Sequence, residues 1–193
     1  FFFSPMNMLW IGAAGLLLFV VLAFVVLLML VFITDCIEYG HWKLGHRNAY
    51  TILTPHPAEA ARLLSTNTAA IQNDRMNAAY QIARQFNCYV VLKGAGSICC
   101  FLDGKRYLNT SGNPGLSTAG TGDVLTGMIA ALIAQGLDTD QALLLAVYLH
   151  GAAADRLLQQ NHGPLGMIAS EIIVAGRILL NAWIYQEKQC RAK

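Results

Sequence analysis

The chain has 193 residues and a formal net charge of +2 at pH 7, and this length suits one domain of ordinary size or a smaller domain with an appended segment. Its basic residues are scattered along the sequence, which excludes the concentrated positive surface that binds a nucleic-acid backbone. Its five cysteines are odd in number and show no metal-ligand spacing, which favours free thiols in the reducing cytoplasm over a disulfide framework.

The first 34 residues differ in composition from the rest of the chain. They contain no charged side chain, and residues 8–33 are almost all apolar, a run longer than the ~20 residues that cross a bilayer. This composition favours a membrane-spanning helix or an uncleaved signal anchor. The alternative is a strand and a helix buried in an α/β core, since such elements are also continuously apolar. Membrane association is therefore expected only through residues 8–33.

Residues 49–53 form a short β-branched and aromatic run that predicts a buried strand, and it leads into the Thr-Pro-His-Pro sequence of residues 54–57. The two prolines hold His56 between the end of this strand and a following helix. Open α/β sheets bind ligands at the carboxyl ends of their strands, so His56 is a candidate binding residue. A turn histidine bonded to the local backbone fits the same pattern, and both interpretations stay open.

A helix and three strands are predicted next. Residues 65–86 carry apolar side chains at intervals of three and four, and Asn87 is a typical helix end. Residues 88–92 form a continuous apolar strand. They are followed by Lys-Gly-Ala-Gly-Ser at 93–97, whose cation, hydroxyl and glycines suit phosphate oxygens. The Asp-Gly pair at 103–104, between two apolar runs, predicts a β-hairpin.

The stretch 113–134 combines a glycine-rich loop with the start of a helix. Gly115, Gly120 and Gly122 allow positive φ angles and close approach of a ligand to main-chain amides. The helix that begins near Asp123 presents unpaired N–H groups and the positive end of its dipole. The stretch therefore predicts an anion hole with a carboxylate base beside it. The alternative is a glycine-rich connection to a buried helix, with Asp123 as an ordinary N-terminal acid.

Two further helices are predicted, at residues 140–159 and 169–183. The first contains the small residues of His-Gly-Ala-Ala-Ala-Asp, 150–155, which fit close helix packing and contact with an adenine ring equally well. Strands that alternate with helices, together with one hairpin, predict an α/β fold with a mostly parallel sheet.

Several of these motifs occur together, in the segments TPHPAEAARLL (54–64), VVLKGAGSI (90–98), GNPGLSTAGTGDVLTGMIAALIAQG (112–136), HGAAAD (150–155) and GPLGMIASEI (163–172). In this order and spacing they resemble the ADP-dependent NAD(P)H-hydrate dehydratases of the ribokinase-like superfamily. The resemblance covers about residues 50–182 and implies a ribokinase-like three-layer α/β/α fold.

The resemblance also implies an activity, the repair of damaged nicotinamide cofactors. The family dehydrates the S form of hydrated NADH or NADPH (NADHX or NADPHX) and converts ADP to AMP and phosphate, with ATP as the donor in some members. Mg²⁺ is implied on the nucleotide phosphates, although no carboxylate pair identifies its protein ligands. The implied partners are thus NADHX or NADPHX and ADP, and family members often form homo-oligomers.

The resemblance assigns roles to individual residues. Asp123 would be the base that takes the proton from the hydroxyl group of the hydrate, whose oxygen then attacks the β-phosphate. His56 would contact the hydrated dinucleotide. The nucleotide-binding residues would be Lys93, Gly94, Ala95, Gly96, Ser97 and Gly122, and the anion hole would consist of the main-chain amides of Gly120, Thr121 and Gly122.

The N-terminal part departs from the family, whose members have a longer N-terminal half with a glycine-rich turn and an acidic segment. The nearest equivalents here are residues 12–15 and 34–38. The resemblance thus implies that residues 35–193 are the C-terminal part of a dehydratase-like domain whose N-terminal half is truncated, with residues 1–34 as a degraded core segment or an anchor. Two other functions stay open: a small-molecule kinase of the hydroxymethylpyrimidine or thiazole type, and a non-catalytic, membrane-tethered nucleotide-binding module.

Overall fold

The computed structural model describes residues 50–191, with side chains as far as residue 185. All of these residues belong to a compact unit that begins at Arg47. The apolar segment 1–34, with its two alternative interpretations, lies outside the described residues. In the described range, no helix combines the length and the apolarity needed to cross a membrane.

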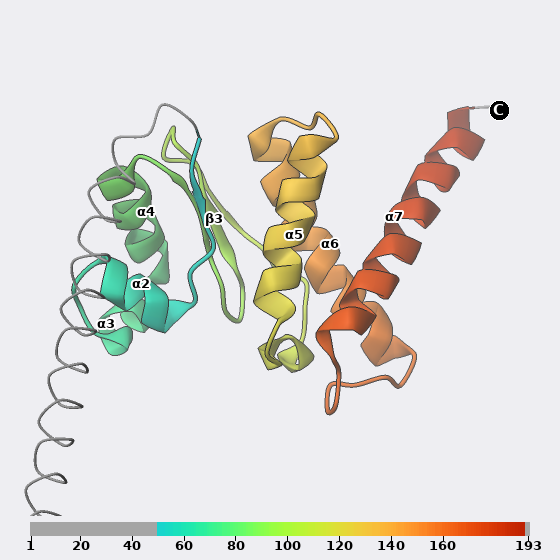
Figure 1. Ribbon diagram of the computed structural model, residues 1–193, viewed down its shortest axis with the longest axis horizontal. Helices are drawn as coiled ribbons and strands as arrows, with labels where there is room; N and C mark the ends of the chain where they lie inside the picture. Colours follow the sequence, from blue (N-terminus) through green and yellow to red (C-terminus); the bar gives the residue numbers. More distant parts are fainter. Residues whose placement is uncertain (1–49, 192–193) are drawn as a thin grey trace, which may run out of the picture. The chain divides into compact units, whose positions relative to one another are not determined.

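A four-stranded sheet in the order β1-β2-β3-β4 separates two groups of helices (Figure 1). β1 and β2 run parallel, whereas β2 and β3, and β3 and β4, run antiparallel. The α/β class and the hairpin at 103–104 are confirmed, but the described sheet is mixed because the loop 93–97 reverses the chain between β2 and β3. The strands are β1 (Ile52–Leu53), β2 (Tyr89–Leu92), β3 (Ile98–Cys100) and β4 (Arg106–Leu108).

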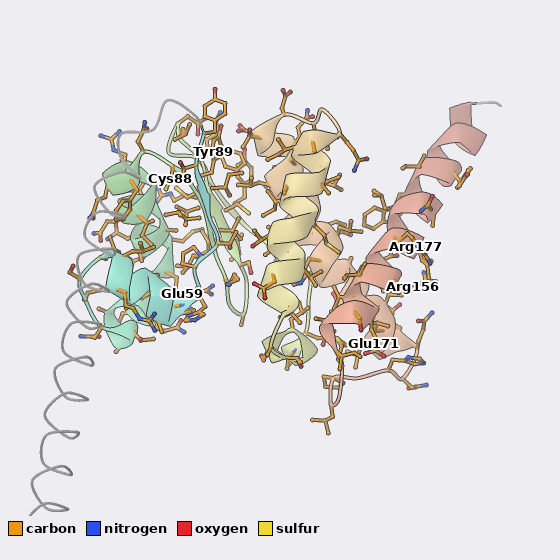
Figure 2. The ribbon with its side chains drawn as sticks, in the orientation of Figure 1. Glu59, Cys88, Tyr89, Arg156, Glu171 and Arg177 are labelled. Carbon is orange, nitrogen blue, oxygen red and sulfur yellow. The ribbon has the colours of Figure 1, made fainter. Side chains whose placement is uncertain are left out.

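Helices α2 (Pro57–Leu63), α3 (Thr68–Asn73) and α4 (Arg75–Phe86) lie on one side of the sheet, and α4 packs on β2 and β3 (Figure 1). The helix predicted over residues 65–86 is divided at Asp74, whose backbone (φ −144°, ψ 76°) leaves the helical region while its carboxylate accepts the amide of Asn77 and caps α4. Figure 2 shows side chains filling the space between α4 and the sheet.

On the other side of the sheet lie α5 (Thr121–Ala134), α6 (Thr139–Gln159) and α7 (Ala169–Arg191), preceded by the short 3₁₀ helix η1 (Pro114–Ser117). Helices α5 and α6 lie between the sheet and α7 (Figure 1). One buried apolar cluster joins the sheet to α5 and α6: Tyr89, Val91, Cys99, Phe101, Leu125, Ile129, Leu132, Ala142, Leu143, Ala146 and Val147. Helices on both faces of the sheet form the predicted three-layer arrangement.

Candidate functional site

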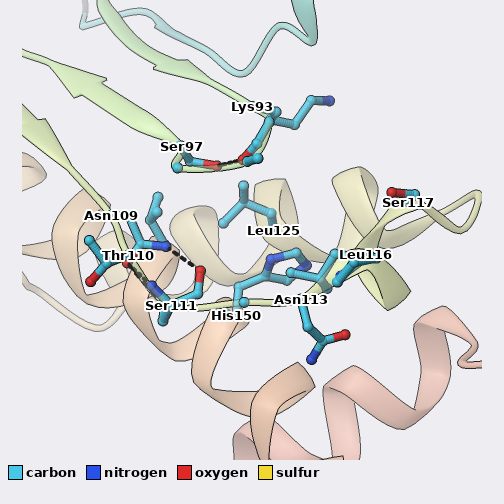
Figure 3. Close-up of a pocket in the computed structure, with 17 residues that line it drawn as sticks. Lys93, Ser97, Asn109, Thr110, Ser111, Asn113, Leu116, Ser117, Leu125 and His150 are labelled. Carbon is cyan, nitrogen blue, oxygen red and sulfur yellow. Dashed lines mark hydrogen bonds between the residues drawn. The ribbon is translucent and has the colours of Figure 1, made fainter. Parts of the chain in front are cut away.

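Two adjoining cavities open where the loop 93–97, the loop 109–117 and the first turn of α5 meet. The first, drawn in Figure 3, has a volume of about 400 Å³, and the second has a volume of about 430 Å³. Four residues line both cavities and form their common wall: Lys93, Gly94, Leu116 and Ser117.

All five residues of the predicted nucleotide loop, 93–97, line the first cavity. Figure 3 shows Lys93 and Ser97 on one side of the cavity, with Ser111 and His150 on the opposite side. Within the loop, Gly94 (φ 149°) and Gly96 (φ 70°) have backbone conformations that favour glycine. Such a loop can turn main-chain amides toward a ligand without interference from side chains.

The amides of this loop are available to a ligand. Among the described residues, no acceptor is present for the main-chain N–H groups of Gly94, Ala95 or Gly96. Together with the ammonium group of Lys93 they form a wall of donors and positive charge, which is the environment that phosphate oxygens require.

The second cavity brings together the other predicted site residues, namely His56, the anion-hole segment 120–122 and Asp123. The side chain of Asp123 is exposed. It forms no hydrogen bond or ion pair within the part of the chain that the structure describes. Gly122 lies against Lys93, since a Cβ atom at this glycine would be 2.9 Å from Nζ of Lys93. The carboxylate of Asp123 and the ammonium group of Lys93 thus line one cavity.

The three predicted anion-hole amides differ in availability. Those of Gly120 and Gly122 have no main-chain acceptor among residues 50–191, whereas the amide of Thr121 lies 3.4 Å from the carbonyl oxygen of Thr118. The Thr121 hydroxyl is 2.7 Å from the carbonyl oxygen of Leu116 and 2.9 Å from that of Thr118. Thr121 therefore secures the loop that precedes α5, which leaves two amides for an anion.

His56 is bonded to the local backbone and also lines the second cavity. Its Nδ1 accepts hydrogen bonds from the amides of Ala58 and Glu59, each at 3.2 Å, and so caps α2. Because Nδ1 is an acceptor, the proton of the neutral ring is on Nε2. The side chain is 47% exposed, and Nε2 lies 3.3 Å from the Glu59 carboxylate. The local bonding is established, and contact of His56 with a ligand stays a prediction.

Glu59, for which no role was predicted, lines neither cavity but contacts two residues that line the second one. Its carboxylate accepts the main-chain N–H of His56 at 2.7 Å and lies 3.8 Å from Nζ of Lys93. A sequence signal for it exists, because an acidic residue three positions after a helix N-cap is the second half of a capping box. Here a histidine takes the place of the usual serine or threonine.

His150, from the predicted 150–155 motif, connects α6 to α5. The residue is only 8% exposed, and Nε2 lies 2.9 Å from the carbonyl oxygen of Thr121. A carbonyl only accepts, so Nε2 carries the proton. Burial lowers the pKa of His150, the bond to Thr121 partly opposes this, and the charge of Lys93 lowers the pKa further. The neutral ring therefore joins the two helices beside both cavities.

Helix α6 also holds the loop 109–117. Asp155 accepts the amide of Gly112 at 2.8 Å and the side-chain amide of Asn113 at 3.1 Å. At Gly151 a methyl group would collide with Ser111, so close packing of the motif is confirmed. Gly151 and His150 also line the first cavity, and their contact with an adenine ring stays a prediction.

The described residues contain no group of three or more His, Cys, Asp or Glu side chains that could hold a metal ion. The arrangement instead provides main-chain donors, one ammonium group and, at a helix N-terminus, one carboxylate that has no partner in the described part of the chain. Such a set can bind a phosphorylated ligand, stabilise charge on a transferred phosphoryl group and accept a proton.

Comparison with known proteins agrees with this arrangement. Residues 30–175 match the family model described as NAD(P)H-hydrate dehydratase. Over 130 residues the chain is 48% identical to the ADP-dependent (S)-NAD(P)H-hydrate dehydratase of Neisseria meningitidis, a match that covers 67% of this chain and 44% of that protein.

Solved structures show the same similarity. The ADP/ATP-dependent NAD(P)H-hydrate dehydratase from Bacillus subtilis, co-crystallized with ATP/Mg²⁺, is 36% identical with a TM-score of 0.67, over 70% of this chain and 49% of that one. A ribokinase-like superfamily protein from Enterococcus faecalis is 28% identical with a TM-score of 0.55, over 67% of this chain and 44% of that one. The chain thus spans less than half of the length of each of these proteins.

Proposed function

Because the chain belongs to the NAD(P)H-hydrate dehydratase family, with a ribokinase-like fold, we propose that it dehydrates the S form of hydrated NADH or NADPH with ADP as the phosphoryl donor. The products are NADH or NADPH, AMP and phosphate. The water that the hydrate loses appears in the phosphate, so the reaction consumes no free water.

The observation that supports this proposal is the second cavity. The exposed carboxylate of Asp123 has no partner among residues 50–191 and shares this cavity with the free amides of Gly120 and Gly122 and with Lys93. A base, two donors for developing negative charge and a cation are the parts that phosphoryl transfer to a hydroxyl group needs.

In the proposed reaction, Asp123 takes the proton of the hydrate's hydroxyl group, and the oxygen forms a bond to the β-phosphorus of ADP. The bond between that phosphorus and the bridging oxygen breaks, and AMP leaves. The amides of Gly120 and Gly122, with Lys93, stabilise the charge on the transferred group. The lone pair of the ring nitrogen then drives cleavage of the carbon–oxygen bond, and phosphate leaves with the electron pair of that bond. Loss of a proton from the neighbouring carbon restores the dihydropyridine.

We place the nucleotide in the first cavity, along the loop 93–97, with its terminal phosphate at the wall that the two cavities share. The residues present fit the phosphates on which Mg²⁺ would be carried, since Lys93 and the loop amides line the first cavity. Mg²⁺ keeps several waters when substrate phosphates bind it, and the described residues contain no cluster of three or more His, Cys, Asp or Glu that would form a cage for it. Bound there, the ion would neutralise phosphate charge. His56, which lines the second cavity, would contact the hydrated dinucleotide there.

The domain organisation remains part of the proposal. We assign residues 35–193 to the C-terminal part of a dehydratase-like domain, and the family model matches residues 30–175. Homo-oligomerisation and membrane association through residues 8–33 stay predictions.

The test is recovery of NADPH from its S hydrate by the full chain, with ADP present or omitted, together with chromatography of AMP. We expect ADP-dependent recovery with one AMP formed per NADPH. Asp123→Asn should abolish turnover and retain AMP binding, whereas Asp138→Asn, which removes a carboxylate outside both cavities, should react like the parent. Turnover by Asp123→Asn at the parent rate would remove Asp123 from the mechanism.

A second assay, with ATP and a hydroxymethylpyrimidine or thiazole alcohol as the acceptor, tests the kinase alternative. A stable phosphorylated product formed with ATP, without release of a dihydropyridine, would show a small-molecule kinase and contradict the dehydratase proposal.

A further inference from the structure

We infer that Arg75 is a positioning residue, which orients the amides of the nucleotide loop and adds positive charge behind them without touching the ligand. Arg75 is the first residue of α4, on the side of the sheet opposite α5 and α6. It does not line either cavity. The inference rests on the nucleotide site of the proposed function, and it concerns a residue to which no motif in the chain assigned a role.

The guanidinium group of Arg75 is bonded to the main chain at two points. Nη1 donates to the carbonyl oxygen of Ala95 at 2.6 Å, and Nη2 donates to that of Leu92 at 3.3 Å. Leu92 is the last residue of β2, and Ala95 is the middle residue of the loop 93–97. A planar group with donors in a fixed fork thereby sets the position of the loop relative to the strand.

Close packing confirms that the loop is built around this side chain. A Cβ atom at Gly94 would lie 2.7 Å from Nη2 of Arg75, so the main chain passes directly over the guanidinium group. Nε of Arg75 is buried and has no partner in the described part of the chain. The two hydrogen bonds and the packing against Gly94 leave the side chain little freedom to move away from the loop.

The bond to Ala95 determines the direction of an amide. In a planar trans peptide the carbonyl and the following N–H point in opposite directions. Since the carbonyl of Ala95 points toward Arg75, the N–H of Gly96 points away from it, and Gly96 lines the first cavity. No acceptor for this N–H is present among the described residues. Arg75 thus directs one donor toward the ligand.

The charge of Arg75 acts in the same sense. The guanidinium group stays protonated under all ordinary conditions, and no carboxylate in residues 50–185 forms an ion pair with it. Its positive charge lies behind the loop, and that of Lys93 lies at the shared wall of the cavities. Partial burial strengthens the attraction of both for an anion, because the surroundings screen them less than water does.

The experiment is calorimetric titration of the full chain with AMP, ADP and adenosine, in the parent, Arg75→Met, Arg75→Lys and Arg84→Met. Arg84 lies on the same helix, is exposed and lines neither cavity, so it is the matched control. We expect Arg84→Met to bind like the parent. Arg75→Met should bind AMP and ADP at least about tenfold more weakly, since a charged donor and an oriented amide are both lost.

Adenosine separates the proposed role from general damage to the fold. Its affinity should change by less than about threefold in Arg75→Met, because it has no phosphate to meet the oriented amide. A merely structural role predicts a lower unfolding temperature without nucleotide, together with parent-like affinity of the folded protein for AMP. That result would overturn the inference.

Arg75→Lys provides the test if the methionine variant does not fold. Lysine keeps the charge and lacks the fixed fork, so we expect it to bind AMP more weakly than the parent and adenosine about as well, and parent-like affinity for AMP would overturn the inference. If the parent binds AMP but does not convert the hydrate, the dehydratase proposal fails, and the affinities of the variants alone decide the role of Arg75. If the parent binds no nucleotide, both fail.

Discussion

The ammonium group of Lys93, a residue that lines both cavities, lies 3.8 Å from the carboxylate of Glu59. The same carboxylate accepts the main-chain N–H of His56. The side chains of Lys93 and Glu59 are 25% and 43% exposed, and an exposed pair of this kind contributes little to stability. The pair matters for position instead, because the Glu59 carboxylate contacts both Lys93, which lines both cavities, and the main chain of His56, the predicted substrate contact.

Glu59→Gln should therefore affect activity more than stability. Glutamine retains an acceptor for His56 but loses the charge that attracts Lys93, and we expect kcat/KM for the hydrate to fall about tenfold with little change in unfolding temperature. NADPH recovery and thermal unfolding measure the two effects. Asp103→Asn is the control, since it removes the carboxylate of another exposed pair, 2.7 Å from Lys105. Parent-like kinetics in Glu59→Gln would contradict this role.

His150 should make stability depend on pH. Burial lowers its folded pKa below the ordinary value of 6.5, so below that value the unfolded chain binds a proton that the folded chain does not. Stability is then fully present above pH 6.5 and is lost as the pH falls toward the lowered pKa.

Urea unfolding at intervals from about pH 7 to about pH 5 should show this decline in the parent. His150→Gln keeps a side-chain donor for Thr121 but cannot titrate, so its free energy of unfolding should depend less on pH. His162→Gln, at an exposed position, should keep the parental slope. An equal slope in His150→Gln and the parent would assign the effect to another group.

Asp155→Asn should weaken the loop that lines the first cavity. The carboxylate accepts from Gly112 and Asn113 through separate oxygens, whereas an asparagine side chain offers one acceptor. We expect a loss of about 1–3 kcal/mol in the free energy of unfolding, because a buried or half-buried donor loses its partner. Urea unfolding measures this, and AMP affinity should fall as well. Asp138→Asn is the control, since its side chain forms no cap bond; an equal loss there would refute the assignment.

Cys88, Cys99 and Cys100 should resist alkylation in the folded protein. All three are free and buried. Burial raises the pKa of Cys88 and of Cys99 to about 12, and raises that of Cys100 as well. Because the thiolate is the reactive form, iodoacetamide should modify these positions only after denaturation, as peptide mass spectrometry can measure. Modification of Cys88 or Cys99 at the unfolded rate would show that the sheet opens readily.

Much of the fold was predictable from local patterns. The strand 88–92, the hairpin at 103–104 and the helix after Gly120 agree with the structure within a few residues. The break at Asp74 was missed, since the apolar periodicity of residues 65–86 continues through it while a side-chain cap begins a new helix there. The antiparallel pairing of β2 with β3 was missed as well, because strand direction depends on which strands meet.

The sequence by itself determined which groups this protein can offer to a ligand: the glycines that free main-chain amides, one lysine after a buried strand and one aspartate at a helix start. Only the tertiary structure decided which of them are available and what supports them. The amide of Thr121 is already bonded to Thr118, and the supports come from Glu59, Arg75, His150 and Asp155. The reason is physical, because local periodicity sets the backbone of each element, whereas hydrogen bonds and burial depend on distances between elements far apart in the chain.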